Sequence, residues 1–329
     1  MPRLVAAPDK FRGTATAAEV AAAIERAAVA RGWTCDAVPV ADGGEGTLAV
    51  LGGGNRTTRV TGPLGSPVDA AWRLDGGTAV IEMAQASGLM LAGGPENNDA
   101  LDATTYGTGE LILAALEGGA RRIVVAVGGS ATTDGGLGAL RAIGSKARLR
   151  GIDVVVACDV TTRFVGAATE FAEQKGATAK QVQLLERRLD RLVDTYVADY
   201  GVDVRDLAGA GAAGGLAGGL AAIGAALVPG FDVVADRLDL EDVIEGADLV
   251  VTGEGYLDAQ SFRGKAVGGV VELAAAAGVA ALVVVGDIDP AIELPAGRPV
   301  VSLVARVGRE QAMADTAGAV EAAIRDYLN

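Results

Sequence analysis

The chain has 329 residues, half of them hydrophobic, which is enough for two domains with cores of ordinary size. Its formal net charge of −14 predicts repulsion from nucleic acids and anionic membranes, so neither is an expected partner. The absence of histidine excludes Ser-His-Asp and Cys-His catalysis and histidine metal sites, and two cysteines are too few for a disulfide framework.

Short Val- and Ile-rich runs alternate with Ala-rich runs along most of the chain. Apolar runs without polar alternation indicate strands buried on both faces, as in a parallel sheet covered by helices. We expect strands at 3–8, 35–40, 78–84, 121–127, 153–160, 247–253, 281–286 and 299–305. The amphipathic runs predict helices at 16–32, 108–119, 178–201, 264–278 and 309–328.

Two segments depart from this alternation. Residues 56–84 alternate polar and apolar side chains between turn signals, which predicts antiparallel strands within an otherwise α/β chain. Residues 207–230 carry no charge over a membrane-spanning length, but they are mostly Gly and Ala, which favours a tightly packed buried helix. The N-terminal run "MPRLVAAPDKF" lacks a long apolar region, so we expect no signal peptide and a cytoplasmic protein.

The first two strands are followed by charged loops. In "APDKFRG", Lys10 and Arg12 are placed to meet an anion, because ligands of open α/β sheets bind beyond the carboxyl ends of strands. The alternative is an ordinary solvated loop. In "ADGGEG", Asp42 and Glu45 flank two glycines before a helical run, where acids can also simply complement the helix dipole.

A third strand ends in "VGGSATTDGG", residues 127–136. Backbone N–H groups of a Gly-rich turn that opens a helix can bind phosphate, and hydroxyls add donors. The candidate phosphate ligands are Gly128, Gly129, Ser130 and Thr132. Asp134 is a candidate metal ligand or proton acceptor; the alternative is that Thr133 or Asp134 only caps the following helix.

Two further glycine clusters follow. "AGAGAAGG" contains Gly209, Gly211 and Gly214, formally the G-x-G-x-x-G of a dinucleotide site, although the preceding "GVDVRDL" makes a poor buried strand. In "TGEGYLDAQSFRGK", the carboxylates of Glu254 and Asp258 with Lys265 suit a magnesium–phosphate site.

Five clusters of Gly, acid and hydroxyl residues, without histidine and without G-x-x-x-x-G-K-[ST], point to phosphoryl transfer by positioning and charge neutralisation. Over nearly its whole length the chain also resembles the glycerate kinase family of the bacterial type I, glycerate 2-kinase-like, group. The motifs that carry this resemblance, in chain order, are "APDKFRGTATAAEVA", "PVADGGEGT", "GTGELI", "VGGSATTDGGLGAL", "ACDV", "EQKGAT", "GAGAAGGLAGGL" and "ADLVVTGEGYLDAQSFRGK".

The resemblance implies a flavodoxin-like α/β domain with a five-stranded parallel sheet, built from residues 1–54 and 247–329. It implies a second α/β domain with a mixed sheet inserted at 55–246, and an active site in the cleft between the two domains.

The implied activity is ATP- and Mg²⁺-dependent phosphorylation of D-glycerate, with 2-phosphoglycerate favoured over 3-phosphoglycerate as product, by a monomer or homodimer. On this reading Lys10 and Arg12 neutralise the carboxylate or the moving phosphoryl group, and Asp42 or Asp134 accepts the hydroxyl proton. Glu254 and Asp258 hold magnesium, while the glycines, Ser130, Thr132 and Lys265 bind the nucleotide. The alternatives are a nicotinamide-dependent dehydrogenase of a small hydroxy acid, which would use Gly209, Gly211 and Gly214, and a sugar-acid sensor without catalysis.

Overall fold

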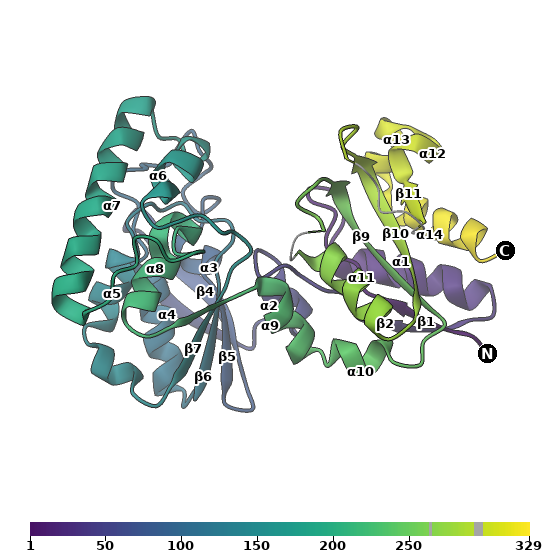
Figure 1. Cartoon of the computed structure of the whole chain (residues 1–329), viewed down its shortest axis with the longest axis horizontal. Coiled ribbons are helices and arrows are strands. Elements are labelled where there is room, and N and C mark those ends of the chain that lie inside the picture. Colours follow the sequence, from purple (N-terminus) through teal and green to yellow (C-terminus); the bar gives the residue numbers. More distant parts are fainter. Residues whose placement is uncertain (263–264, 293–298) are drawn as a thin grey trace. The chain divides into compact units, whose positions relative to one another are not determined.

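The chain folds into two compact units. The structure, a computed structural model, describes residues 1–262, 265–292 and 299–329. One unit, here called the terminal unit, comprises Met1–Asp42 and Phe231–Asn329, and the other, the central unit, comprises Gly43–Gly230 (Figure 1). In the sequence, the central unit is thus inserted into the terminal one. The insert covers Gly43–Gly230, whereas the resemblance implied 55–246.

The terminal unit contains the five parallel strands that the sequence predicts. The sheet order is β11-β10-β9-β1-β2, which is the flavodoxin-like order once the strands are counted along this unit. The strands are β1 (Arg3–Ala6), β2 (Thr34–Ala37), β9 (Leu249–Leu257), β10 (Ala280–Ile288) and β11 (Val300–Ser302).

Helices cover both faces of this sheet, which explains why β1, β9 and β10 begin as buried, largely apolar strands, whereas the edge strand β2 is mostly exposed. Leu4 and Ala6 of β1 pack with α1 (Ala17–Ala30) and α14 (Thr316–Tyr327) on one face. Val5 packs on the opposite face with α10 (Leu240–Ile244) and α11 (Ala266–Ala276). The remaining helices of the unit are α9 (Gly230–Arg237), α12 (Leu303–Val307) and α13 (Arg309–Ala314).

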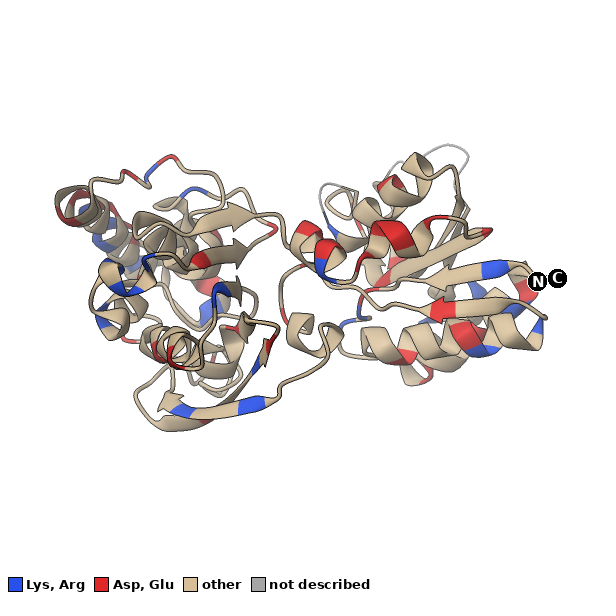
Figure 2. Cartoon of the chain, turned by 90° about the horizontal axis from the view of Figure 1, so that it is seen from below, with Lys and Arg blue, Asp and Glu red and all other residues tan. Residues whose placement is uncertain are grey.

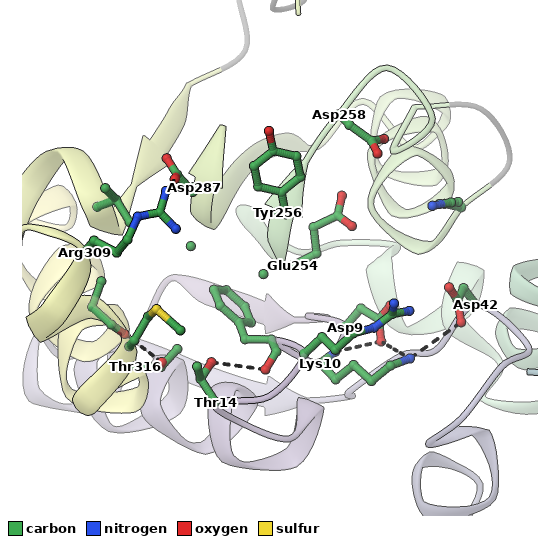
Figure 3. A pocket seen from close by; sticks show the side chains of 18 residues that line it. Asp9, Lys10, Thr14, Asp42, Glu254, Tyr256, Asp258, Asp287, Arg309 and Thr316 are labelled. Atoms are coloured by element: carbon green, nitrogen blue, oxygen red, sulfur yellow. Dashed lines mark hydrogen bonds and ion pairs between the residues drawn. The ribbon is translucent and has the colours of Figure 1, made fainter. Parts of the chain in front are cut away.

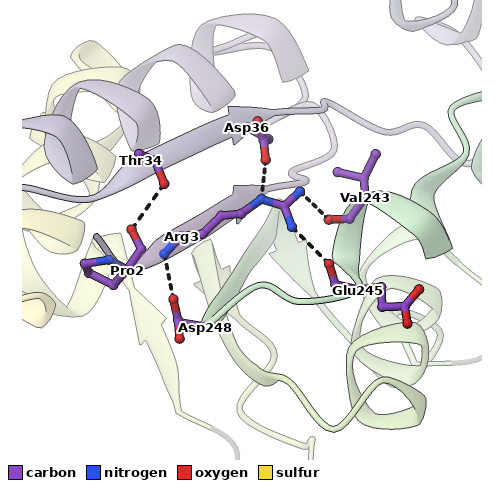
Figure 4. Close-up of polar contacts among 7 residues, drawn as sticks. All are labelled: Pro2, Arg3, Thr34, Asp36, Val243, Glu245 and Asp248. Atoms are coloured by element: carbon purple, nitrogen blue, oxygen red, sulfur yellow. Dashed lines mark hydrogen bonds and ion pairs between the residues drawn. The ribbon is translucent and has the colours of Figure 1, made fainter.

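Arg3 fastens the start of β1 to segments that lie far away in the sequence (Figure 4). Its Nε donates to Asp36 Oδ2 at 2.7 Å, and its Nη1 and Nη2 donate to the carbonyl oxygens of Glu245 and Val243 at 3.0 and 2.8 Å. The backbone N–H of Arg3 donates to Asp248 Oδ2 at 2.7 Å. One planar guanidinium therefore joins β1, β2 and the end of α10.

The central unit has a six-stranded mixed sheet in the order β3-β4-β5-β6-β7-β8. The expected antiparallel strands are confirmed: β3 pairs antiparallel with β4, and β4 with β5, and the later pairs are parallel. The strands are β3 (Arg56–Thr61), β4 (Pro67–Asp75), β5 (Thr78–Glu82), β6 (Arg122–Ala126), β7 (Asp153–Ala157) and β8 (Ala226–Val228).

The longest helix of the central unit, α7 (Ala179–Tyr200), buries one apolar face and begins at the capping box formed by Thr178 and Gln181. Acidic and basic residues are interspersed over the helices of both units (Figure 2). The other helices are α2 (Thr47–Val50), α3 (Ala84–Ser87), α4 (Tyr106–Glu117), α5 (Leu137–Ile143), α6 (Gly166–Phe171) and α8 (Leu216–Ala222), with short 3₁₀ turns at Lys146–Leu149, Glu173–Lys175 and Ala212–Gly215.

Several predicted elements differ in extent from the observed ones, and three of these differences change the structure of a segment. Residues 207–230 do not form one helix: α8 covers only Leu216–Ala222 of the segment, and β8 follows it at the sheet edge. The expected helix 309–328 is broken where Asp315 caps α14, and the expected strand 299–305 stops at Ser302, which caps α12. Within the described residues, none of the helices combines the length and the apolar character needed to span a bilayer.

Candidate active site

A cavity of about 390 Å³ lies in the terminal unit beyond the carboxyl ends of β1, β9 and β10 (Figure 3). The chain leaves β1 toward α1 on one face of the sheet and leaves β9 toward α11 on the other. Ligands of open α/β sheets bind at such a switch point, because the diverging connections leave a crevice between them. Six of the residues singled out in the sequence line this cavity: Lys10, Arg12, Asp42, Glu254, Asp258 and Lys265.

Lys10 lies between two carboxylates at one end of the cavity (Figure 3). Its Nζ is 3.7 Å from Asp42 Oδ1 and 3.9 Å from Asp9 Oδ1. Asp9 is nearly buried, and this burial raises its pKa to about 6 although Lys10 lowers it. The loop after β1 and the segment after β2 therefore place one cation and two carboxylates together.

Glu254 stands at the end of β9 with a buried oxygen, Oε1, that accepts no hydrogen bond from the described residues. Burial raises the pKa of this carboxyl to about 7, against the opposing effects of Ser261 and Lys265. A cation or a hydrogen-bond donor of a ligand would satisfy this oxygen. Without such a partner, a buried acceptor costs free energy of folding.

These residues fit a magnesium ion only together with ligands from a substrate. Within residues 1–262, 265–292 and 299–329, no three metal-binding side chains converge. A magnesium ion in a kinase site needs only one or two carboxylates, because substrate phosphates and waters supply the other ligands, so the open oxygen of Glu254 fits. Asp258 is less open: its Oδ1 accepts from Gln260 N at 2.7 Å and from Ser261 N at 3.1 Å, which shapes the following turn.

In the central unit, the Gly-rich loop 127–136 packs tightly against its neighbours. A Cβ added at Gly128 would lie 2.7 Å from the backbone of Glu45, and Gly129 has a φ of +68°. Ser130 is paired with Gly88 across an isolated bridge. The glycines thus allow a close backbone approach that other residues would prevent.

Thr132 of this loop is fully buried, and its hydroxyl finds no hydrogen-bond partner among the described residues. Its carbonyl oxygen accepts from the buried ammonium of Lys175 at 2.7 Å. Asn98 Nδ2 adds bonds to the carbonyl oxygens of Ala131 and Lys175, at 2.9 and 2.8 Å. Lys175 lies in the quoted "EQKGAT" motif, but it was not singled out, because its polar neighbours do not mark it as buried.

Asp134 is occupied by contacts inside the central unit. Its Oδ2 accepts from Thr105 N and Thr105 Oγ1, both at 2.8 Å, and from Gly138 N at 3.1 Å. Its Oδ1 accepts from Gly136 N at 3.0 Å. These contacts tie the start of α4 to the start of α5, and they favour the capping alternative over a role as base or metal ligand.

The three glycines of the formal dinucleotide pattern lie in a different setting from the one the pattern requires. Residues 202–208 before them form no strand, so the strand–turn–helix context of that fingerprint is absent. Instead Gly211 packs against the backbone of Arg163, and Gly214 against the carbonyl group of Thr132. Nothing in this arrangement supports the dehydrogenase alternative.

The cavity also contains residues that the sequence analysis did not single out as ligands. Asp9 lies in the quoted "APDKFRG" motif, so its position in the loop was a usable signal. The others come from the loop after β1, from the ends of β9 and β10 and from the helical region after β11. They are Phe11, Thr14, Tyr256, Asp287, Val304, Arg309, Ala312, Met313 and Thr316.

Comparison with known proteins gives a consistent result. The model of the "Glycerate kinase family" matches residues 4–147 and 145–329. The glycerate 2-kinase of Escherichia coli (strain K12) is 41% identical, with 83% of this chain and 82% of that protein covered, and the glycerate kinase of Bacillus subtilis (strain 168) is 40% identical, with 87% and 85% covered. A crystal structure of a Salmonella typhimurium LT2 protein, described as a candidate glycerate kinase 2, superposes with a TM-score of 0.83 at 35% identity and covers 99% of this chain and 97% of that one. The chain therefore belongs to the glycerate kinase family.

Proposed function

We propose that the protein transfers the γ-phosphoryl group of ATP to a hydroxyl group of D-glycerate. Family membership and the names of the relatives support the reaction class. The observation that carries the proposal is the cavity at the switch point, where Lys10 lies between two carboxylates and Glu254 keeps a buried oxygen without a partner. Phosphoryl transfer depends mainly on such positioning and charge neutralisation.

The residues of the cavity suggest a division of labour. Lys10 and Arg12 neutralise anionic oxygens of the glycerate carboxylate or of the phosphoryl group in flight. Glu254, supported by the turn at Asp258, holds a magnesium ion, which when bound screens the phosphate charges. Lys265, at the start of α11, contributes a further positive charge to the same cavity.

The reaction needs an acceptor for the hydroxyl proton as the substrate oxygen bonds to the γ-phosphorus and the bond to ADP breaks. Asp42 is the better of the two predicted bases, because it lines the cavity beside Lys10, whereas Asp134 does not line it and accepts five hydrogen bonds within the central unit. In the central unit, Gly128, Gly129 and Ser130 remain our proposed phosphate ligands. The product we propose is 2-phosphoglycerate, as the name of the E. coli relative suggests.

The test is ADP release with D-glycerate, ATP and magnesium, followed by phosphorus NMR of the product. We expect glycerate-dependent ADP and the resonance of 2-phosphoglycerate. The variant Lys10→Met should lose at least about 100-fold in kcat/KM, since it removes a charge that acts on the transition state. Lys180→Met, at an exposed position of α7, is the matched control and should behave like the wild type.

An absence of glycerate-dependent ADP in the wild type would refute the kinase proposal. A resonance of 3-phosphoglycerate would refute only the proposed regiochemistry. Binding of D-glycerate without turnover would instead support the sensor alternative.

A further inference from the structure

The cavity in the terminal unit has two ends of different character. Lys10, Asp9 and Asp42 lie at one end, whereas Thr14, Thr316, Asp287 and Arg309 lie toward the other (Figure 3). The second region also contains apolar lining from the helices after β11, namely Val304, Ala312 and Met313. Phosphate chemistry explains the charged end but does not explain this apolar lining.

Two of the lining side chains are large, apolar and open to solvent. Met313 is 56% exposed and Tyr256 is 49% exposed, and both line the cavity. A thioether chain adapts to irregular flat surfaces, and a tyrosine ring offers a face for stacking. Exposed apolar groups gathered in a concave site are typical of a ligand surface.

Glycerate does not match this second region. Each of its three carbon atoms carries oxygen, so contact with Met313, Val304 and Ala312 would leave its polar atoms without partners. The cavity of about 390 Å³ also falls in the range of roughly 300–1,000 Å³ that accommodates drug-sized ligands. A flat heteroaromatic ring with apolar faces and polar edges fits the lining better.

We propose that the end of the cavity lined by Phe11, Tyr256, Val304, Ala312 and Met313 binds the nucleobase of ATP, while the end around Lys10 and Glu254 binds its phosphates. The inference deepens the proposed function and rests on it. Asp287 and Arg309 form an ion pair beside this lining. Their carboxylate and guanidinium provide an acceptor and donors for the polar edge of the base.

The experiment compares ATP with inorganic tripolyphosphate, which has the phosphates but lacks the base. Binding of each magnesium complex is measured by calorimetry for the wild type and for the double variant Met313→Ala/Tyr256→Ala. The double variant Met90→Ala/Tyr327→Ala is the matched control, because it truncates the same residue types at exposed positions outside the cavity.

We expect the wild type to bind ATP at least tenfold more tightly than tripolyphosphate. The cavity variant should lose at least tenfold in ATP affinity, since stacking on one aromatic ring alone is worth about fivefold or more, and its tripolyphosphate affinity should stay within about twofold of the wild type. The control variant should change neither affinity.

Three results would overturn this site. They are equal wild-type affinities for ATP and tripolyphosphate, an unchanged ATP affinity in the cavity variant, or a cavity variant whose KM rises for glycerate but not for ATP. If the wild type still produces glycerate-dependent ADP in any of these cases, only the nucleobase site fails. A wild type that produces no such ADP refutes the underlying function instead.

Discussion

Lys175 lies buried behind the Gly-rich loop of the central unit, where its ammonium group donates a hydrogen bond to the carbonyl oxygen of Thr132. Burial lowers the pKa of its ammonium group to about 7, although the nearby Asp134 carboxylate raises it. In the unfolded chain the same group keeps a pKa near 10.5. Between these two values the unfolded chain binds more protons than the folded one, so this lysine makes stability rise with pH.

We therefore expect Lys175→Met to remove part of the pH dependence of stability. From pH 7 to pH 9 the free energy of unfolding should rise by about 2 kcal/mol more in the wild type than in the variant. Urea unfolding of the central unit gives the measurement. Trp72 reports this unit alone when Trp33, the other tryptophan of the chain, is replaced by Phe in all proteins.

Lys180→Met is again the control, because it changes the same side chain at an exposed position of α7 and should follow the wild type at both pH values. Parallel pH profiles for wild type and Lys175→Met would contradict the lowered pKa of Lys175.

At the scale of residues, the sequence predicted the charged members of the cavity because they follow apolar strands, and parallel strands end at one edge of a sheet. Lys10 and Glu254 are examples. The sequence could not predict that Asp134 would be saturated by Thr105, because the two residues are 29 positions apart in the chain. It also could not predict Met313, whose contact with the cavity depends on how α12 and α13 turn after β11.

At the scale of elements, close contacts with a neighbouring loop determine the conformation of the glycine-rich turn before α8 more than its composition does. Gly214 has a φ of +64°, and a Cβ there would overlap the carbonyl oxygen of Thr132. Gly201, which follows α7, has a similar backbone conformation, with a φ of +74°, but has nothing within 4 Å of an added Cβ. Both positions have a left-handed backbone that would strain any other residue, and they differ in the close approach to a neighbour.

We expect Gly201→Ala to destabilise the central unit by about 1 kcal/mol, the usual cost of a non-glycine residue in the left-handed conformation. Gly214→Ala should cost at least about 3 kcal/mol, because the added methyl group must also displace the loop that contains Thr132. Urea unfolding followed by Trp72 gives both values. Equal losses for the two variants would show that the contact with Thr132 contributes nothing.

The difference between a local sequence signal and a packing contact also explains which elements were predictable. The helix at 16–32 was predicted within two residues at each end, because Thr16 and Glu19 form a capping box. The segment 207–230 gave no such signal: small residues allow either a helix or close loop packing, and only the contacts of Gly211 and Gly214 decide between them. Likewise β8 at Ala226–Val228 is too short to leave a periodic pattern.

At the scale of the whole molecule, the terminal unit depends on contacts between its two chain segments, Met1–Asp42 and Phe231–Asn329. Arg3→Lys should lower the stability of this unit by about 1 kcal/mol, because lysine cannot reproduce the planar fork that reaches Asp36, Val243 and Glu245. The unfolding of the terminal unit can be followed by Trp33 in a Trp72→Phe background.

The control for this prediction is Arg306→Lys, which makes the same change in the same unit, in an ion pair with Asp326 whose two side chains are 38% and 60% exposed. Such pairs contribute little, so its effect should stay within about 0.5 kcal/mol. A loss at Arg3 that is no larger than this would mean that the guanidinium fork is not a stabilising link.

The insertion of one unit into the other has a consequence for how the chain folds as it is made. The backbone N–H of Arg3 cannot form its hydrogen bond with Asp248 until 245 further residues have been synthesised. At about 5–20 residues per second, ribosomes take roughly 12–50 s to synthesise that stretch. Of the two sheet neighbours that β1 has in the described residues, only β2 is available during this interval, while every residue of the central unit emerges. We infer that the central unit folds before the terminal unit, although the chain begins with residues of the terminal unit.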